Sequence, residues 1–391
     1  MQGSIERVRA IIHGRTPDRP ALYELLRNDA VISHFAGEKL TIENSPEVIF
    51  RAFAPAVDAT RPRVRLPQRE QTCQLPDGRR QRCYRWTEWT EPKVYADSTA
   101  YATVKRAWLN HNEPSWSPRR QEQMNRFLVD TAETRRKLGS GSVTSPRGAV
   151  KLRPVTWRGS PIPDAQCSML NSSGAAGPGE VFFFPVAPDV QLLMGIYTEV
   201  GLEQFSYYLA DDPDLIDQLL ERHTELAVSF IEHLPADNDI EALFFGDDLA
   251  FKTGPILSPA WFAEHYFHRL ARITAACHTR NIKVLFHSDG NLNSILDGLV
   301  QAGIDGLNPI EVLAGMDIAD IHRRHPHLFL AGGIDVSELL PGGTPQQVKD
   351  AVRRAIDAAE GRLMVGSTTE LHDAVPLENY LALRQAVLEC R

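Results

Sequence analysis

Residues 283–291 read KVLFHSDGN, an apolar run that ends abruptly in a histidine, a serine and an aspartate. Side chains at positions i and i+2 of a strand lie on the same face, so a strand here would bring His287 and Asp289 to one spot. An imidazole beside a carboxylate can act as a general acid–base pair, or the two groups can ligate a divalent metal ion. The motif leaves both chemistries open.

Polar residues end other apolar runs of the chain in the same way. Asp248 ends the preceding run, and we assign it to catalysis together with His287 and Asp289. We expect the remaining polar residues at run ends to bind substrate: Glu24, Asp247, Asn308, Glu311, Asp335 and His372. One such carboxylate is often only the N-cap of the next helix. Acid, imidazole or amide at the ends of several runs instead predicts a polar pocket, provided that the runs end at one face.

Parallel strands covered by helices would position these groups. Five apolar runs in the second half are each followed by a helical pattern: 242–248, 283–289, 305–311, 328–335 and 363–370. That alternation is typical of a parallel sheet, either a barrel or an open doubly wound sheet. Three weaker strand candidates, at 20–26, 50–60 and 180–187, bring the total to eight. We therefore predict an α/β fold, a TIM-type (β/α)8 barrel formed by a single domain over residues 1–391.

The middle of the chain, residues 62–179, lacks this alternation and is predicted to be an inserted cap over the barrel mouth. It contains a hairpin pattern (72–90), a polar helical pattern (117–138) and a loop (171–180). Cys73 and Cys83 flank the hairpin turn LPDGRR, so we expect them to face each other across the two strands as reduced thiols.

Composition excludes several classes of protein. The 391 residues carry a formal net charge of −8, which argues against a protein that coats nucleic acid or an anionic membrane. No apolar run approaches the about 20 residues that a membrane span needs, and the N-terminus does not resemble a signal peptide. Five scattered cysteines without CxxC spacing predict neither a disulfide framework nor a structural zinc knot. We expect a cytoplasmic protein.

The second half resembles the uroporphyrinogen decarboxylase superfamily. The segments that carry this resemblance are FFGDDLAFKTGPILSP, FHSDGNLNSILDGLVQAGIDGLNPIE, LFLAGGIDVSELLPGGTPQQV and VPLENYLAL, and RVRAIIHGRTPDRPALYELL resembles the start of such chains. The superfamily includes methyltransferases that move methyl groups to or from corrinoid proteins and coenzyme thiols. True uroporphyrinogen decarboxylases have an arginine-containing RQAGR-type segment, where this chain has LYELLRNDAV with only Arg27. Substrate carboxylates of a porphyrinogen would lack partners here, so the methyltransferase branch is the closer match.

That branch implies a metal site, with a departure in this chain. Its members hold zinc through a His-x-Cys motif and a later cysteine. His287 matches the histidine, Asp289 replaces the first cysteine, and Glu370 or Thr369 falls near the second. We predict His287, Asp289 and Glu370 as ligands of zinc or of a harder divalent cation. A hydrogen-bonded acid–base pair without metal is the alternative.

These features predict a methyltransferase that moves a methyl group from a small ether, amine or thioether to a corrinoid, with the metal as Lewis acid. Asp248 would protonate the leaving group if burial raises its pKa. A small-molecule substrate and a corrinoid protein are the expected partners, and the resemblance implies a homodimer. The alternatives are a decarboxylase or lyase of a small acid, with Asp248 or His287 as proton donor, and a non-catalytic ligand-binding barrel.

Overall fold

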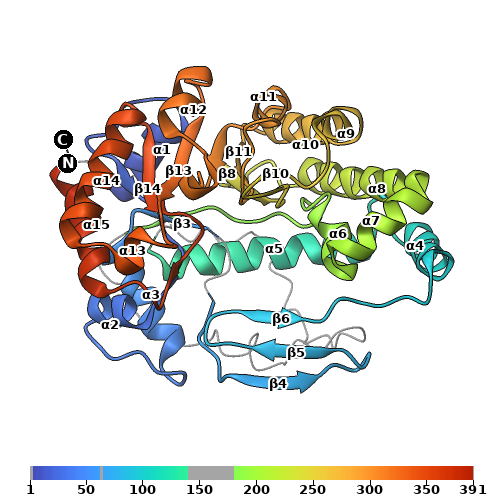
Figure 1. Ribbon diagram of the computed structural model, residues 1–391, viewed down its shortest axis with the longest axis horizontal. Coiled ribbons are helices and arrows are strands. Elements are labelled where there is room, and N and C mark those ends of the chain that lie inside the picture. Colours follow the sequence, from blue (N-terminus) through green and yellow to red (C-terminus); the bar gives the residue numbers. More distant parts are fainter. Residues whose placement is uncertain (1–2, 62–64, 140–179, 391) are drawn as a thin grey trace.

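The computed structural model describes residues 3–61, 65–139 and 180–390, and it is a mixed α/β protein (Figure 1). Its main element is a six-stranded parallel sheet in the order β1-β14-β13-β12-β11-β8. The strands are β1 (Ala21–Leu22), β8 (Ala242–Gly246), β11 (Lys283–His287), β12 (Gly306–Asn308), β13 (Phe329–Ile334) and β14 (Leu363–Ser367). The five predicted runs of the second half are therefore confirmed as neighbouring parallel strands.

Two further strands lie between the edges of this sheet. β3 (Ala59–Thr60) pairs in parallel with β7 (Phe182–Phe183). On one side, Tyr23 of the segment after β1 forms a parallel bridge with Ala59. On the other side, the backbone N–H of Phe244 in β8 donates to the carbonyl of Pro185, at 2.8 Å. Backbone contacts thus connect β3 with the residue after β1, and the residues after β7 with β8, while β3 and β7 themselves form a separate two-stranded sheet.

The predicted strand at 50–60 is wrong for most of its length. Residues Ser45–Ala56 form helix α3, which begins with a proline in its first turn and buries Val48, Ile49 and Phe53. Proline is tolerated at the first turn of a helix because the N–H that it lacks would have no helical partner there. Only Ala59 and Thr60, after the helix ends, are in a strand.

Helices follow the strands as the alternation requires. The predicted helix at 211–234 is α8 (Pro213–Glu232), and Asp212 caps it by accepting from the N–H of Leu215. Thr344 and Gln347 form a capping box at α14 (Pro345–Ala358). The other helices of this part are α1 (Ser4–Ile12), α2 (Asp29–Ala36), α6 (Met194–Val200), α7 (Leu202–Asp211), α9 (Pro259–His265), α10 (Phe267–Thr279), α11 (Leu296–Gln301), α12 (Ile318–Arg324), α13 (Leu339–Gly342) and α15 (Leu377–Glu389).

Apolar side chains form two clusters. The larger one packs the helices against the strands. The smaller one gathers alternate residues of the strands with side chains of α1, including Ile11, Tyr23, Phe244, Leu285 and Phe329. Side chains from both edges of the six-stranded sheet therefore meet in one buried cluster, as they do inside a barrel.

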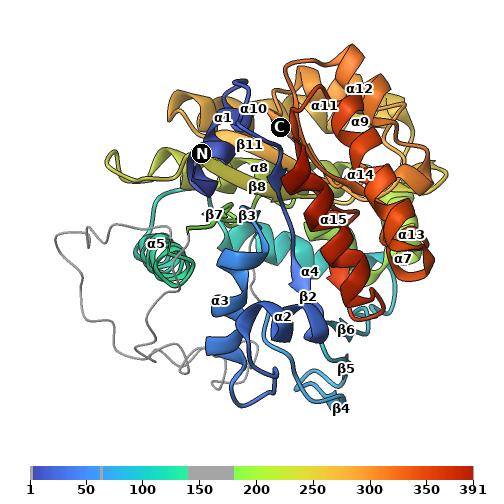
Figure 2. The ribbon, with the colours of Figure 1, turned by 90° about the vertical axis from the view of Figure 1, so that its left-hand side faces the viewer.

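Residues 65–139, the described part of the predicted insertion, contain a three-stranded antiparallel sheet and two helices. The sheet consists of β4 (Gln71–Gln74), β5 (Arg80–Cys83) and β6 (Glu88–Thr90), and the helices are α4 (Ser98–His111) and α5 (Pro118–Lys137). The sheet lies at one end of the molecule, with both termini toward the other end (Figures 1 and 2). The predicted hairpin and polar helix are confirmed; residues 171–179 of the predicted loop lie outside the described residues.

The two hairpin cysteines do not face each other. Cys73 pairs with Gln81, and Cys83 pairs with Gln71, because the turn places them two positions out of register. Both are free thiols.

The short strands that complete the fold are β2 (Leu26–Arg27), β9 (Ala250–Phe251), β10 (Gly254–Pro255) and β15 (Leu371–His372). Among the described residues, none of the helices has the length and apolar composition needed to cross a bilayer.

Candidate metal centre

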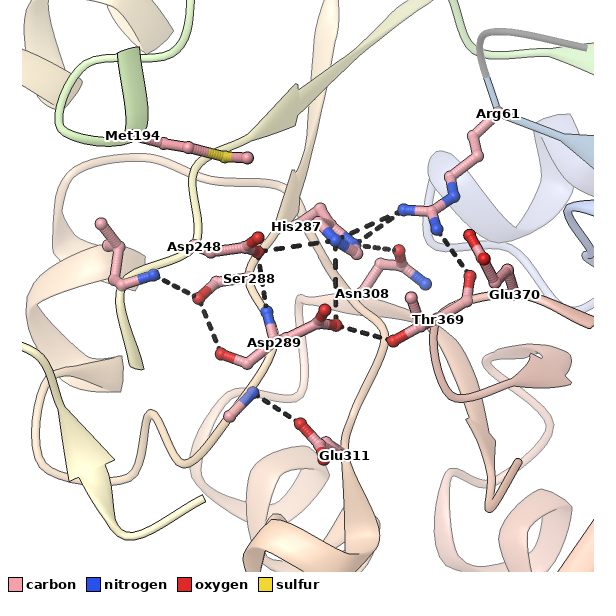
Figure 3. A network of polar contacts seen from close by, with 12 residues as sticks. Arg61, Met194, Asp248, His287, Ser288, Asp289, Asn308, Glu311, Thr369 and Glu370 are labelled. Atoms are coloured by element: carbon pink, nitrogen blue, oxygen red, sulfur yellow. Dashed lines mark hydrogen bonds and ion pairs between the residues drawn. The ribbon is translucent and has the colours of Figure 1, made fainter. Parts of the chain in front are cut away.

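Three ionisable side chains meet beyond the carboxyl ends of two neighbouring strands. β11 ends at His287, which is paired with Gly246 at the end of β8. The His287 Nε2 atom lies 3.7 Å from an oxygen of Asp248 and 3.8 Å from an oxygen of Asp289 (Figure 3). One ligand atom of each of these residues lies within 4.8 Å of the other two. The sequence analysis assigned these same three residues to catalysis.

Asn308 determines which nitrogen of His287 carries the proton. The amide nitrogen of Asn308 donates to the carbonyl of Ala331 at 2.9 Å, so its oxygen faces the imidazole. That oxygen lies 2.7 Å from Nδ1 of His287 and can only accept. Nδ1 therefore holds the hydrogen, and Nε2 presents a lone pair toward the two carboxylates. Metal-ligating histidines are commonly oriented in this way.

The surroundings of His287 favour its neutral form. The residue is 7% exposed and packs against the ring of Phe244. Burial lowers the pKa of His287, and the nearby Arg61 guanidinium lowers it further, while Asp289 and Asp248 oppose the shift. A neutral imidazole is the form that can ligate a metal ion.

The two carboxylates are more open than the imidazole. The Asp248 side chain is 33% exposed and the Asp289 side chain 37%. Thr369 donates its hydroxyl to Asp289 at 2.8 Å, and the N–H of Asp289 donates to Asp248 at 3.1 Å. These bonds orient both groups toward His287. Both carboxylates are thus partly buried and in contact with His287.

Asp247, the neighbour of Asp248, is fully buried and has a different environment. Its carboxylate accepts from the N–H groups of Leu193 and Met194 and from the hydroxyl of Tyr266, at 2.6–3.1 Å. Burial raises the pKa of Asp247 to about 6. These bonds connect the start of α6 and Tyr266 to the end of β8, and Asp247 has no exposed surface.

Glu24 is also engaged within the protein. Its carboxylate accepts from the N–H and the hydroxyl of Ser367 and from the N–H of Leu25. Burial raises its pKa to about 7. The contacts connect the segment after β1 to the end of β14, and the residue is 2% exposed.

The remaining predicted residues lie around the three-residue cluster. Asp335 accepts from the backbone N–H groups of residues 337–339 and so stabilises the loop that leads into α13. His372 lies near the carbonyl of Val336 through Nε2, at 3.1 Å, and Glu311 accepts from the N–H of Gly290 at 2.7 Å. Glu370 forms an ion pair with Arg27 and is not a member of the cluster. The third carboxylate or imidazole of the cluster is Asp248, where we had predicted Glu370 as the third metal ligand.

A pocket of about 570 Å³ opens beside the cluster. Its lining includes Asp289, Glu311, Thr369, Glu370 and His372, together with the exposed residues Thr87 and Lys252. Thr87 belongs to the segment 62–179 that we predicted as an insertion, and it contributes to the pocket wall.

Sequence reasoning missed Arg61. Its guanidinium lies 3.0 Å from Nδ1 of His287 and donates to the carbonyl of Thr369 at 2.6 Å. The residue stands in the basic stretch RPRVRLPQRE, whose composition is typical of a solvated surface. The position of Arg61 directly after a weak strand candidate was the only sequence signal that it lies near His287.

The site and fold define an α/β protein with a histidine–carboxylate cluster at the carboxyl ends of parallel strands. A family model for uroporphyrinogen decarboxylase (URO-D) matches residues 191–390, about half of the chain. The chain belongs to this family.

Two relatives are methyltransferases. A methylated-thiol–coenzyme M methyltransferase of Methanosarcina mazei is 25% identical over 217 residues, and the match spans 52% of this chain and 53% of that protein. The match thus extends over only about half the length of this curated relative. A solved structure of a methyltransferase from Methanosarcina mazei superimposes with a TM-score of 0.58 at 17% identity, covering 100% of this chain and 99% of that one. At this identity the likeness shows the fold alone.

Proposed function

We propose that this protein is a methyltransferase that takes a methyl group from a small ether, amine or thioether and delivers it to a corrinoid. Membership in the URO-D family and the methyltransferase relative support the reaction class. The observation that carries the proposal is the cluster of Asp248, His287 and Asp289, whose ligand atoms lie within 4.8 Å of one another. Its geometry suits a metal-assisted transfer.

The donor set fits a divalent cation. Asp248, His287 and Asp289 would hold the ion through two carboxylates and the lone pair on Nε2, a set that suits zinc and also harder ions such as manganese. When bound, the ion supplies Lewis acidity at the heteroatom that loses its methyl group, and the corrinoid supplies the nucleophile. No cysteine stands among these ligands, in contrast to the thiolate sites that the family resemblance implied.

The chain's own residues prepare this site. Asn308 fixes the tautomer and the ring orientation of His287, and Thr369 orients Asp289. Glu311 holds the backbone after Asp289 through the N–H of Gly290. These bonds reduce the reorganisation that ligand binding requires, because the donor atoms already point at one another.

The fold would support such a site in two ways. The parallel bridge between Tyr23 and Ala59 and the hydrogen bond from the N–H of Phe244 to the carbonyl of Pro185 are contacts expected if the eight strands close as a (β/α)8 barrel, with the site at its carboxyl face. The inserted segment 62–179 would act as a cap, since Thr87 lines the pocket. Exposed Lys252 at the pocket wall suggests access from the surface, which a corrinoid protein needs.

Elemental analysis of purified protein tests the metal assignment. Wild type should hold near-stoichiometric metal by inductively coupled plasma mass spectrometry after incubation with zinc or manganese. His287→Ala, Asp248→Asn and Asp289→Asn should each lose most of it, whereas Glu370→Gln should retain it because Glu370 pairs with Arg27.

Metal-loaded wild type should then convert cob(I)alamin to methylcobalamin in the presence of a methylated substrate, as followed by absorbance. An absence of metal in wild type would refute the metal-assisted mechanism. The decarboxylase alternative, which uses the same histidine as an acid–base group, would then become the first hypothesis.

A further inference from the structure

Arg61 is a buried cation that directly contacts the candidate metal centre. It follows β3, is 7% exposed, and directs its guanidinium toward His287 and the backbone of Thr369 (Figure 3). The guanidinium carbon lies 5.2 Å from the centroid of the Phe244 ring, which fixes its plane. The side chain is therefore held in place next to the site where we propose that methyl transfer occurs.

The Arg61 guanidinium has more N–H donors than the neighbouring groups offer acceptors. Only Nη2 has a clear acceptor, the carbonyl of Thr369. Nη1 lies 3.0 Å from Nδ1 of His287, which carries the hydrogen donated to Asn308 and cannot accept another. It also lies 3.4 Å from Nε2, a long contact to the lone pair that a bound metal ion would occupy. Nε is buried without a partner in the described part of the chain. A buried N–H donor without an acceptor destabilises the folded protein, and a bound ion, water or ligand can supply the missing acceptor.

The charge of Arg61 is also poorly balanced. Within residues 3–61, 65–139 and 180–390, no carboxylate lies within ion-pair distance of it. Glu24 is close enough to be affected by its charge, but burial raises the pKa of Glu24 to about 7, so Glu24 is only partly ionised near neutral pH. A divalent ion on Asp248 and Asp289 would neutralise those two carboxylates and leave Arg61 as an uncompensated buried cation.

Neighbouring arginines add to the positive charge. Arg27 lines the pocket and pairs with Glu370. The pKa of Arg27 is lowered, first by burial and also by repulsion from Arg65 and Arg61. The guanidinium groups of Arg27, Arg61 and Arg65 therefore repel one another. Among the described residues, the ion pair between Arg27 and Glu370 is the only one that these three groups form.

We propose that Arg61 binds a carboxylate of the substrate, which makes the methyl donor a small methylated carboxylic acid. This inference rests on the proposed function and narrows its substrate class. Arginine suits the role because its donors match the two oxygens of a carboxylate. Arg61 would act as a specificity-determining residue, with the anion held on one side of His287 and the methylated heteroatom on the other.

Matched pairs of acids and amides test this inference by binding alone. Methoxyacetate and 3-methoxypropionate are titrated by calorimetry into the zinc-supplemented full-length protein, beside methoxyacetamide and 3-methoxypropanamide. The amides keep the shape of the acids and remove the charge. Wild type should bind at least one acid about tenfold or more tightly than its amide, since a charge-assisted bond replaces a neutral one.

Two variants and a control separate anion binding from a structural role. Arg61→Gln should bring the ratio of acid to amide affinity close to one and leave amide binding unchanged. Arg61→Lys should keep part of the preference, because it keeps the charge and loses the paired donors. Arg82→Gln, which removes an exposed arginine on β5, should behave as wild type.

Equal affinity of wild type for acids and amides, or no binding of either acid, would overturn the inference. So would a preference for acids that persists in Arg61→Gln. Metal content measured on the same samples distinguishes this failure from failure of the proposed function. If Arg61→Gln loses the preference for acids but keeps its full metal content, the role of Arg61 is supported. If wild type prefers acids and Arg61→Gln does not, but neither protein holds metal, the role of Arg61 is supported and the metal-assisted methyl transfer is refuted.

Discussion

Replacing Asn308 should weaken metal binding without removing a ligand. Asn308 accepts from Nδ1 of His287 at 2.7 Å and is itself held by the carbonyl of Ala331. In Asn308→Leu nothing would hold the proton on Nδ1, so the imidazole could turn or change tautomer and withdraw the Nε2 lone pair. Loss of such a partner typically lowers metal affinity about 10- to 100-fold. That range corresponds to about 1.4–2.7 kcal/mol of binding free energy.

Asn308→Asp provides the opposite test at the same position. A carboxylate would accept from Nδ1 as the amide oxygen does and would raise the basicity of the imidazole. The carboxylate would also lose the amide donor to the carbonyl of Ala331, so we expect zinc affinity well above that of Asn308→Leu together with a loss of stability.

Competition with a chromophoric chelator measures zinc affinity, and thermal unfolding of the same samples reports on folding. Asn379→Leu is the matched control, because Asn379 is equally buried and also donates to backbone carbonyls, those of Leu340 and Gly343. It should lower stability and leave zinc affinity unchanged. A folded Asn308→Leu protein that binds zinc as tightly as wild type would refute the role assigned to Asn308, and with it the tautomer of His287.

Three further predictions concern stability. The pKa of Glu24 is raised from 4.5 to about 7 in the folded protein, so the contribution of this one group to stability is greatest at low pH and falls by roughly 3 kcal/mol as the pH rises from about 4.5 to about 7. Glu24→Gln should remove that part of the pH dependence in urea unfolding at a series of pH values. A Cβ on Gly366 would lie 1.9 Å from the carbonyl oxygen of Tyr23, so Gly366→Ala should lower the free energy of unfolding by about 1–3 kcal/mol, measured by chemical unfolding. Gly342→Ala is the control and should lower it far less, because a Cβ there would meet no atom within 4 Å. Asp335→Ala should lower stability by about 0.5–2 kcal/mol through its lost backbone contacts. If it abolished substrate binding at unchanged stability, the substrate role predicted from the sequence would be correct instead.

The second half of the chain was predictable because its signals are local. The apolar runs from 242 onward are almost entirely buried and alternate with helices, so pattern alone located the strands. Capping residues mark the starts of three of these helices: Ser258, Asp317 and Thr344. The polar residues at their ends follow from the same pattern, since parallel strands bring their carboxyl ends to one face. His287, Asp289 and Asp248 were found in this way.

The first half was harder to predict because its strands are very short. β1, β3 and β7 have two residues each, too few to show a period in sequence. The segment at 50–60 has an apolar content that suits a strand as well as a helix, and only its packing in α3 decides between them. The residue pairing of the hairpin was likewise fixed by the geometry of its turn, which placed Cys73 and Cys83 opposite glutamines.

What the sequence by itself determined is the order of the strands and helices of the second half, and the kinds of polar group at the strand ends. Only the tertiary structure decided what each of those groups does. Asp247 and Asp248 are adjacent in sequence, yet Asp247 is fully buried and the side chain of Asp248 is 33% exposed beside His287. The difference arises because donors that are distant in sequence, at the start of α6 and on Tyr266, surround only Asp247. Long-range contacts also decide the position of Arg61, although its basic segment is typical of a surface. Arg61 lies between His287, which is 226 positions away in the sequence, and Thr369, which is 308 positions away.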